Sequence, residues 1–85
     1  DVPYFTQERA DNPRSRTAEE WCNFAMELYA KDQFTEAIRY FDEAIRLKPD
    51  YKLAYYYRAA CKEDMKEEKA ALTDYQICMH LDPLF

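Results

Sequence analysis

The feature that most constrains this chain is an internal repeat with a period of 34 residues. Residues of the same character recur at this distance in five pairs: Trp21 and Tyr55, Ala25 and Ala59, Ala37 and Ala71, Phe41 and Tyr75, and Pro49 and Pro83. A fixed period of roughly 20–50 residues is typical of stacked repeat architectures. Stacked helical repeats form extended concave surfaces that hold other proteins, so the period favours binding over catalysis.

Apolar residues within each unit follow the spacing of an amphipathic helix. In the first unit, Trp21, Phe24 and Leu28 recur three and then four residues apart, which gives one apolar face. Ala37, Phe41 and Ile45 give a second face of the same kind. The pattern predicts helices over 18–31, 35–48, 51–64 and 68–81.

Capping signals support these helices. Thr17 with Glu20 forms a capping box that opens the first helix. Thr35 and Asp50 are residue types that cap the second and third helices well. We therefore expect side-chain caps at all three positions.

The turns within the two units contain no glycine, because the chain has none. The turns are expected at 31–33 and 65–67, around Asp32 and Lys66. Aspartate tolerates a left-handed backbone better than lysine does, so we expect strain in the second turn.

The second unit departs from the pattern at two charged residues. Arg58 and Lys62 stand where the first unit has apolar side chains. Their aliphatic stems can cover a core while the charged groups reach water. The register of this helix is left open by a competing apolar stripe over Leu53, Tyr57, Ala60 and Cys61.

The spaced residues of the first unit resemble the motif of the tetratricopeptide repeat family. That motif has Trp, Leu, Gly and Tyr on a first helix and Ala, Phe or Tyr, Ala and Pro on a second. The corresponding residues here are Trp21, Phe24, Ala25, Leu28, Ala37, Phe41, Ala44 and Pro49. The resemblance implies an all-α fold of two tandem helix-turn-helix repeats, stacked as a right-handed α-solenoid fragment. It divides the chain into an N-terminal extension or arm (1–17), repeat 1 (18–51) and repeat 2 (52–85).

The resemblance also implies a peptide-binding groove, because the first helix of each repeat lines the concave face in this family. The groove positions are Glu19, Cys22, Asn23, Met26, Tyr29, Leu53, Tyr56 and Tyr57. Tyrosine offers a large contact area and methionine adapts its shape, which suits an apolar or aromatic segment with basic flanks. Cys22 has two interpretations, a small filler or a reactive thiol.

A chaperone-binding function is disfavoured by the residues at the positions that would carry it. Some members of the family hold the acidic C-terminal tails of heat-shock chaperones with a clamp of Lys, Asn and Arg. Here Cys22 and Met26 replace the first Lys and Asn of that clamp, and Tyr57 replaces a later Asn. If the two units are aligned with the later pair of a clamp, Asn23 matches but Leu53 and Tyr57 replace Lys and Arg.

Charge and composition exclude several other functions. The net charge of −5 disfavours binding of nucleic acid, and no apolar run reaches the ~20 residues of a membrane span. Three cysteines, an odd number, argue against a disulfide framework and favour a reducing cytoplasmic compartment. The single histidine, His80, has no second ligand at metal-binding spacing. No phosphate loop, nucleophile motif or cofactor fingerprint is present, so we expect no catalytic residue, no metal or cofactor, and no enzymatic activity.

The last predicted helix carries an apolar face without a partner in the sequence. In a repeat stack, each second helix packs on the first helix of the next repeat. The residues of this face are Leu72, Tyr75, Met79 and Leu81. We expect it to mediate self-association, with a homodimer through the C-terminal helix. An alternative to peptide binding is thus a structural packing role in a larger assembly. Stacks usually need about three units, so we also expect the chain to be a piece of a longer protein.

Overall fold

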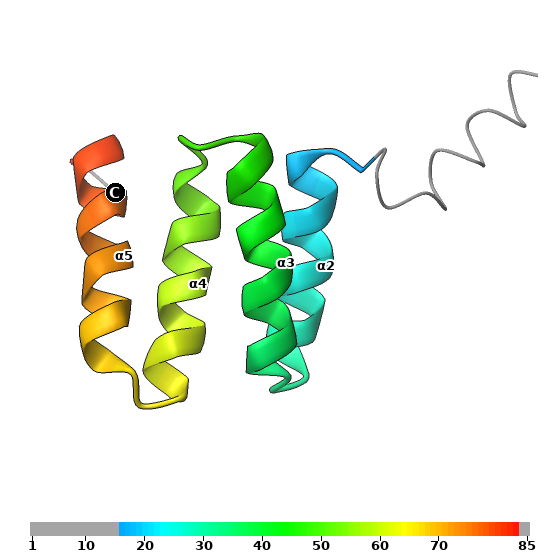
Figure 1. The fold of residues 1–85 in the computed structure, drawn as a ribbon, viewed down its shortest axis with the longest axis horizontal. Helices are drawn as coiled ribbons and strands as arrows, with labels where there is room; N and C mark the ends of the chain where they lie inside the picture. The colour runs from blue at the N-terminus through cyan, green and yellow to red at the C-terminus, as the bar shows by residue number, and fades with distance from the viewer. Residues whose placement is uncertain (1–15, 84–85) are drawn as a thin grey trace, which may run out of the picture.

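The computed structural model describes residues 16–83, which form four helices in sequence. These are α2 (Ala18–Ala30), α3 (Phe34–Leu47), α4 (Lys52–Asp64) and α5 (Glu68–Leu81). The chain reverses direction between consecutive helices, and each helix packs against the next (Figure 1). This arrangement confirms the predicted all-α fold of two stacked helix-turn-helix repeats. Residues 1–15 of the predicted arm lie outside the described residues.

The first helix begins at the predicted capping box. The Thr17 hydroxyl accepts a hydrogen bond from the Glu20 backbone N–H (3.1 Å), and the Glu20 carboxylate accepts one from the Thr17 N–H (2.8 Å). These two bonds satisfy N–H groups that have no partner within the helix.

The caps predicted at Thr35 and Asp50 are wrong. Gln33 and Tyr51 precede the first residues of α3 and α4, and within the described residues neither side chain makes a cap hydrogen bond. Phe34 packs its ring against Tyr29 at 5.7 Å between centroids, which draws the start of α3 one residue earlier. Tertiary packing therefore overrides the local capping preference.

Both turns adopt the left-handed backbone that the absence of glycine made unfavourable. Asp32 has φ 62° and Lys66 has φ 68°. After each, a backbone N–H reaches back to close the helix end: Gln33 to Leu28 at 2.9 Å, and Glu67 to Lys62 at 2.8 Å. A side chain with a Cβ costs about 1–2 kcal/mol in this conformation, and lysine has no local hydrogen bond to offset that cost.

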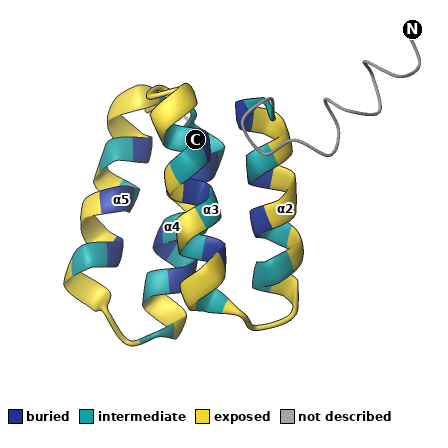
Figure 2. Cartoon of the chain, turned by 45° about the vertical axis from the view of Figure 1, so that its right-hand side comes forward, coloured by how far each residue is buried: buried dark blue, intermediate teal, exposed yellow. Residues whose placement is uncertain are grey.

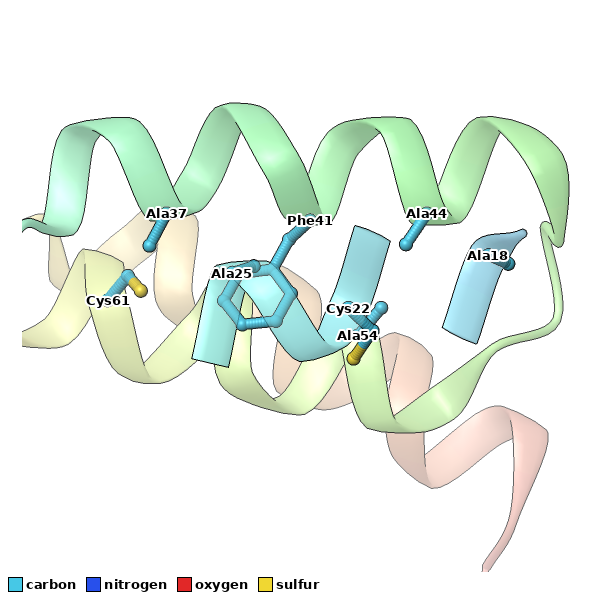
Figure 3. Packing of buried hydrophobic residues seen from close by; sticks show 8 residues of the cluster. All are labelled: Ala18, Cys22, Ala25, Ala37, Phe41, Ala44, Ala54 and Cys61. Carbon is cyan, nitrogen blue, oxygen red and sulfur yellow. The ribbon is translucent and has the colours of Figure 1, made fainter. Parts of the chain in front are cut away.

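Small residues and one phenylalanine form the core between the repeats (Figure 3). Its members are Ala18, Cys22, Ala25, Ala37, Phe41, Ala44, Ala54 and Cys61. Phe41 is 0% exposed and has the largest side chain of this group. The buried residues of each helix face its neighbours, and the exposed ones face outward (Figure 2). Because most core residues are small, the helices approach closely and half-buried aromatic rings pack around them.

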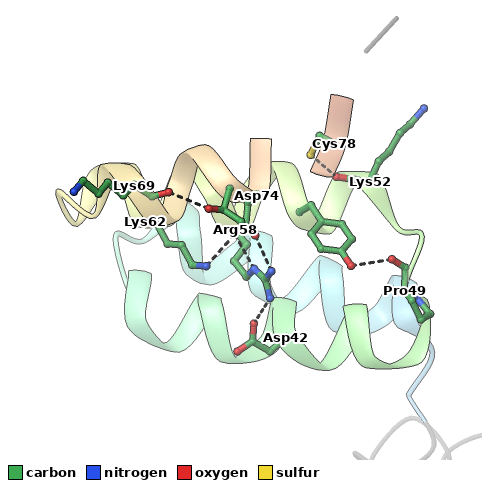
Figure 4. A network of polar contacts seen from close by, with 10 residues as sticks. Asp42, Pro49, Lys52, Arg58, Lys62, Lys69, Asp74 and Cys78 are labelled. Carbon is green, nitrogen blue, oxygen red and sulfur yellow. Dashed lines mark hydrogen bonds and ion pairs between the residues drawn. The ribbon is translucent and has the colours of Figure 1, made fainter. Parts of the chain in front are cut away.

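A buried ion network joins α4 to α5. Asp74 on α5 is 2% exposed, and its carboxylate accepts two hydrogen bonds from Arg58, at 2.9 and 2.8 Å (Figure 4). Lys62 lies 3.0 Å from the same carboxylate, and Arg58 also reaches Asp42 on α3 at 2.7 Å. Ala59 is fully buried at its motif position and the two cations beside it face α5, whereas Cys61 of the competing stripe is fully buried against repeat 1, so both faces of α4 are packed.

The charge of Arg58 is stabilised despite its partial burial. Burial lowers the pKa of the Arg58 guanidinium, but its hydrogen bonds and its attraction to Asp74 and Asp42 outweigh this and raise the pKa above its ordinary value. Arg58 therefore remains a cation that links α3, α4 and α5.

Candidate peptide-binding surface

Cys22 does not lie on the binding surface. It is 0% exposed and belongs to the core, against which Tyr51 also packs. The prediction of Cys22 as a groove residue is therefore wrong, because its side chain is enclosed in the core between the repeats. The structure matches the alternative interpretation of a small filler, and burial raises the pKa of the Cys22 thiol.

The remaining predicted groove residues are accessible to different degrees. Glu19, Asn23 and Tyr56 are exposed. Met26, Tyr29, Leu53 and Tyr57 are half-buried, and all but Leu53 pack against the core. These residues have part of their surface available to a partner and part committed to the fold.

Four tyrosines form a continuous chain of rings across three helices. The ring of Tyr29 on α2 lies 5.9 Å from that of Tyr57 on α4. Tyr57 lies 5.4 Å from Tyr56, which in turn lies 5.7 Å from Tyr75 on α5. Tyr57 also stacks on Phe41 at 6.1 Å, which anchors the chain of rings to the core.

An apolar hollow of about 650 Å³ lies at the end of this chain of rings, between α4 and α5. It is lined by Leu53, Tyr56, Tyr57, Tyr75, Cys78 and Met79. From the sequence, Tyr75 and Met79 were expected on a separate self-association face, and Cys78 was not expected at either surface. The structure instead brings these three residues to the same surface as the predicted groove residues of α4.

The predicted self-association face is only partly outward. Leu72, Met79 and Leu81 are exposed, the first two at 56% and 62%. Tyr75 is half-buried against α4, and its hydroxyl donates a hydrogen bond to Glu63 at 2.9 Å. Tyr75 is therefore held partly over α4 by this hydrogen bond and by the contact with Tyr56, while the rest of its ring lines the hollow.

Burial changes the acidity of several hydroxyl and thiol groups. Burial, with a smaller contribution from the carboxylate of Glu63, raises the pKa of Tyr75 to about 12. Burial likewise raises the pKa of Tyr51 to about 12 and that of the Cys61 thiol to about 12. Cys22, Cys61 and Cys78 are all buried free thiols whose pKa is raised, which makes them poor nucleophiles.

We expect stability to fall between pH 10 and 12, and Tyr75→Phe to weaken that dependence. An unfolded tyrosine loses its proton near pH 10, before the folded Tyr75 does at about 12, so rising pH favours the unfolded state in this window. The phenylalanine variant lacks this proton, so its free energy of unfolding should fall less steeply. Urea unfolding at several pH values, followed by circular dichroism, measures both slopes. If the free energy of unfolding depended on pH equally in both proteins, the raised pKa of Tyr75 would be contradicted.

Residues 16–83 contain neither a membrane-spanning helix nor a metal-binding cluster. Among these residues, no helix is long and apolar enough to cross a membrane. No group of His, Cys, Asp and Glu in the same range has an arrangement that could hold a metal ion.

Comparisons with known proteins agree with the fold. A family model described as "Tetratricopeptide repeat" matches residues 18–51. The chain is 34% identical over 68 residues to stress-induced-phosphoprotein 1 of Caenorhabditis elegans, which covers 80% of this chain and 21% of that protein. It is 30% identical over 82 residues to the Hsp70-Hsp90 organizing protein of Triticum aestivum, covering 96% of this chain and 13% of that protein. Hsp70-Hsp90 organizing protein 1 of Glycine max is 32% identical over 82 residues, with the same coverage.

The chain thus spans between 13% and 21% of the length of these relatives. The match covers the first helical pair, and the second pair repeats its arrangement with the same small buried residues. With its four helices and its 34-residue period, this chain belongs to the tetratricopeptide repeat family.

Proposed function

We propose that this chain is a non-catalytic protein-interaction module that holds an apolar or aromatic peptide segment with basic flanks. The observation that carries the proposal is the hollow between α4 and α5 and the tyrosine rings that lead into it. Tyrosine rings supply contact area at a low cost in conformational entropy, and Met79 adapts its shape to the bound side chain. The module comprises repeat 1 over 18–51 and repeat 2 over 52–85, with 1–17 as an extension.

Acidic residues near the hollow favour basic flanks on the partner. Glu63 lies beside Tyr75 at one end of the hollow, and Glu68 lines a smaller depression next to it. The net charge of −5 adds a longer-range attraction for cationic peptides. A partner with lysines or arginines around an aromatic core therefore fits this surface in both shape and charge.

The binding of acidic chaperone tails is a second candidate, suggested by the names of the relatives, which organise Hsp70 and Hsp90. The residues at the clamp positions of this chain argue against it. Cys22 is buried, and Met26, Leu53 and Tyr57 carry no positive charge. An acidic tail would meet apolar rings and carboxylates rather than cations.

The three buried free thiols support a reducing, cytoplasmic location.

We expect the chain to bind a lysine-flanked tyrosine and leucine peptide more tightly than an acidic peptide that ends in a free carboxylate. Tyr56→Ala removes an exposed ring of the hollow, so it should weaken binding of the lysine-flanked peptide by roughly 5–30-fold, equivalent to about 1–2 kcal/mol. Isothermal titration calorimetry of the full chain with the two peptides measures both effects.

Leu47→Ala is the matched control, because Leu47 is also an exposed large apolar residue but does not line the hollow. It should leave the affinity unchanged. Tighter binding of the acidic peptide, no binding of the lysine-flanked one, or an equal loss in both variants would contradict the proposal.

A further inference from the structure

The second helix of repeat 1 is covered by a following helix, whereas the equivalent face of repeat 2 borders the hollow. By the 34-residue period, Tyr75, Cys78 and Met79 of repeat 2 correspond to Phe41, Ala44 and Ile45 of repeat 1. In repeat 1 the α4 helix covers this surface: Phe41 and Ala44 are 0% exposed and Ile45 packs against the core. In repeat 2 the same positions border the open hollow, and Met79 is 62% exposed. The molecule thus shows what fits this surface, which is an apolar helix antiparallel to the helix beneath it (Figure 1).

The α2 helix of a second copy does not fit there. Ala54 and Cys61 are the α4 residues that enter the core of repeat 1, and their counterparts in α2 are Glu20 and Glu27. Both glutamates are exposed. Seating α2 of another molecule in the hollow would bury these two carboxylates, at a cost of several kcal/mol each unless they are paired. Open-ended stacking of copies is therefore unfavourable.

The α5 helix of a second copy does fit. One helical stripe of α5 carries the exposed Leu72, Gln76 and Met79 together with the half-buried Tyr75, which lines the hollow. When two α5 helices are placed antiparallel about a two-fold axis between residues 75 and 76, Leu72 of each copy lies opposite Met79 of the other. The two most exposed apolar side chains of the helix are thereby paired.

The charges at the ends of α5 support the same register. Lys69 is exposed in the first turn, and Asp82 follows the last residue of the helix. About the same two-fold axis, Lys69 of each copy lies opposite Asp82 of the other, which adds two ion pairs of opposite charge. Asp82 already pairs with Lys52 of its own chain, so each carboxylate would sit between two cations.

We propose that a second copy of this chain covers the hollow, forming a symmetric dimer through α4 and α5. The two α5 helices lie antiparallel at the centre and the two α4 helices flank them, giving a bundle of four helices. The dimer hides Tyr75 and Met79, so it competes with a peptide bound in the hollow. It forms without peptide, so a failure of the peptide experiment above leaves this inference intact.

Analytical ultracentrifugation of the full chain from about 5 to about 500 μM tests the assembly. We expect a reversible monomer–dimer equilibrium that stops at the dimer, with a dissociation constant on the order of 10–100 μM, because the surface of two short helices is small. Met79→Lys should raise this constant more than tenfold, since it places a lysine opposite Leu72 of the other copy on each side of the two-fold axis. Leu47→Lys, a matched exposed site on α3 outside the hollow, should leave it unchanged.

Thermal melting at low protein concentration, followed by circular dichroism, separates effects on assembly from effects on folding. Met79 is exposed in the monomer, so Met79→Lys should have the same melting temperature as the parent chain. A strict monomer at the highest concentration, growth beyond a dimer, or equal effects of both lysine variants would overturn the inference.

Chemical crosslinking tests the register. Leu72→Cys and Met79→Cys variants are mixed and treated with a short thiol-specific crosslinker. We expect the mixed pair to crosslink more than either variant alone, because the proposed register places residue 72 opposite residue 79. If either variant alone crosslinked as much as the mixed pair, the proposed register would be contradicted.

Discussion

Replacing Asp74 with alanine is expected to lower the free energy of unfolding by about 3–5 kcal/mol, since removing one partner leaves buried charges without compensation. The Asp74 carboxylate is 2% exposed, accepts hydrogen bonds from Nε and Nη2 of Arg58 and lies 3.0 Å from Lys62. Without it, Lys62 loses this carboxylate and Arg58 keeps only the ion pair with the exposed Asp42, although both cations are largely screened from water. Urea unfolding followed by circular dichroism, with a stabilising osmolyte added for the weakest variants, measures the loss.

Asp42→Ala is the matched control for this prediction. Asp42 also binds the Arg58 guanidinium, at 2.7 Å, but its side chain is 51% exposed. An exposed ion pair contributes about 0–1 kcal/mol, so its removal should cost far less than the removal of Asp74. Equal losses in the two variants would show that burial of Asp74 does not determine the strength of the network.

The network explains why the sequence predicted the helices well and this part of their packing poorly. Helix positions follow from the spacing of small and apolar residues, which does not depend on what each side chain contacts. The partner of Arg58 and Lys62 was missed because a lone aspartate on a helix is usually solvent-exposed. A comparison of the repeats contained the signal: Phe24 and Tyr40 of repeat 1 correspond to Arg58 and Asp74 of repeat 2.

Both positions thus change together from aromatic to charged, and the two new charges are opposite. Such a joint change indicates a contact, since neither charge would be tolerated alone at a buried position. In the structure, Arg58 and Asp74 make this contact.

The candidate surface was predicted in part, for a related reason. Leu53, Tyr56 and Tyr57 of α4, which were predicted because the family places the first helix of a repeat on the concave face, line the hollow. Cys22 was misplaced because its side of α2 is buried in the core, against which Tyr51 packs, and the spacing within α2 does not show this contact. Tyr75 was separated from the groove because the spacing within α5 does not fix how the helix is rotated against α4.

Replacing Phe41 with alanine is expected to lower the free energy of unfolding by about 3–5 kcal/mol. Phe41 is 0% exposed and stacks on Tyr57 with an angle of 7° between the rings. Its removal leaves a cavity between the two repeats, where α3 and α4 meet. A fold of this size has only a few kcal/mol of net stability, so the variant should be largely unfolded at room temperature. Phe41→Leu, which keeps most of the buried volume, should remain folded with a smaller loss, so that urea unfolding measures a graded series.

Tyr75→Ala provides an internal control, because Tyr75 occupies the equivalent position of repeat 2. The two residues differ mainly in that α4 covers Phe41, whereas Tyr75 faces the open hollow and is half-buried. At low protein concentration, Tyr75→Ala should therefore cost clearly less than Phe41→Ala. The difference measures the stabilisation that a covering helix gives to this position. Equal costs would contradict this account, because the covering helix would then contribute nothing, and repeat 2 would be as well packed with its face open as repeat 1 is with its face closed.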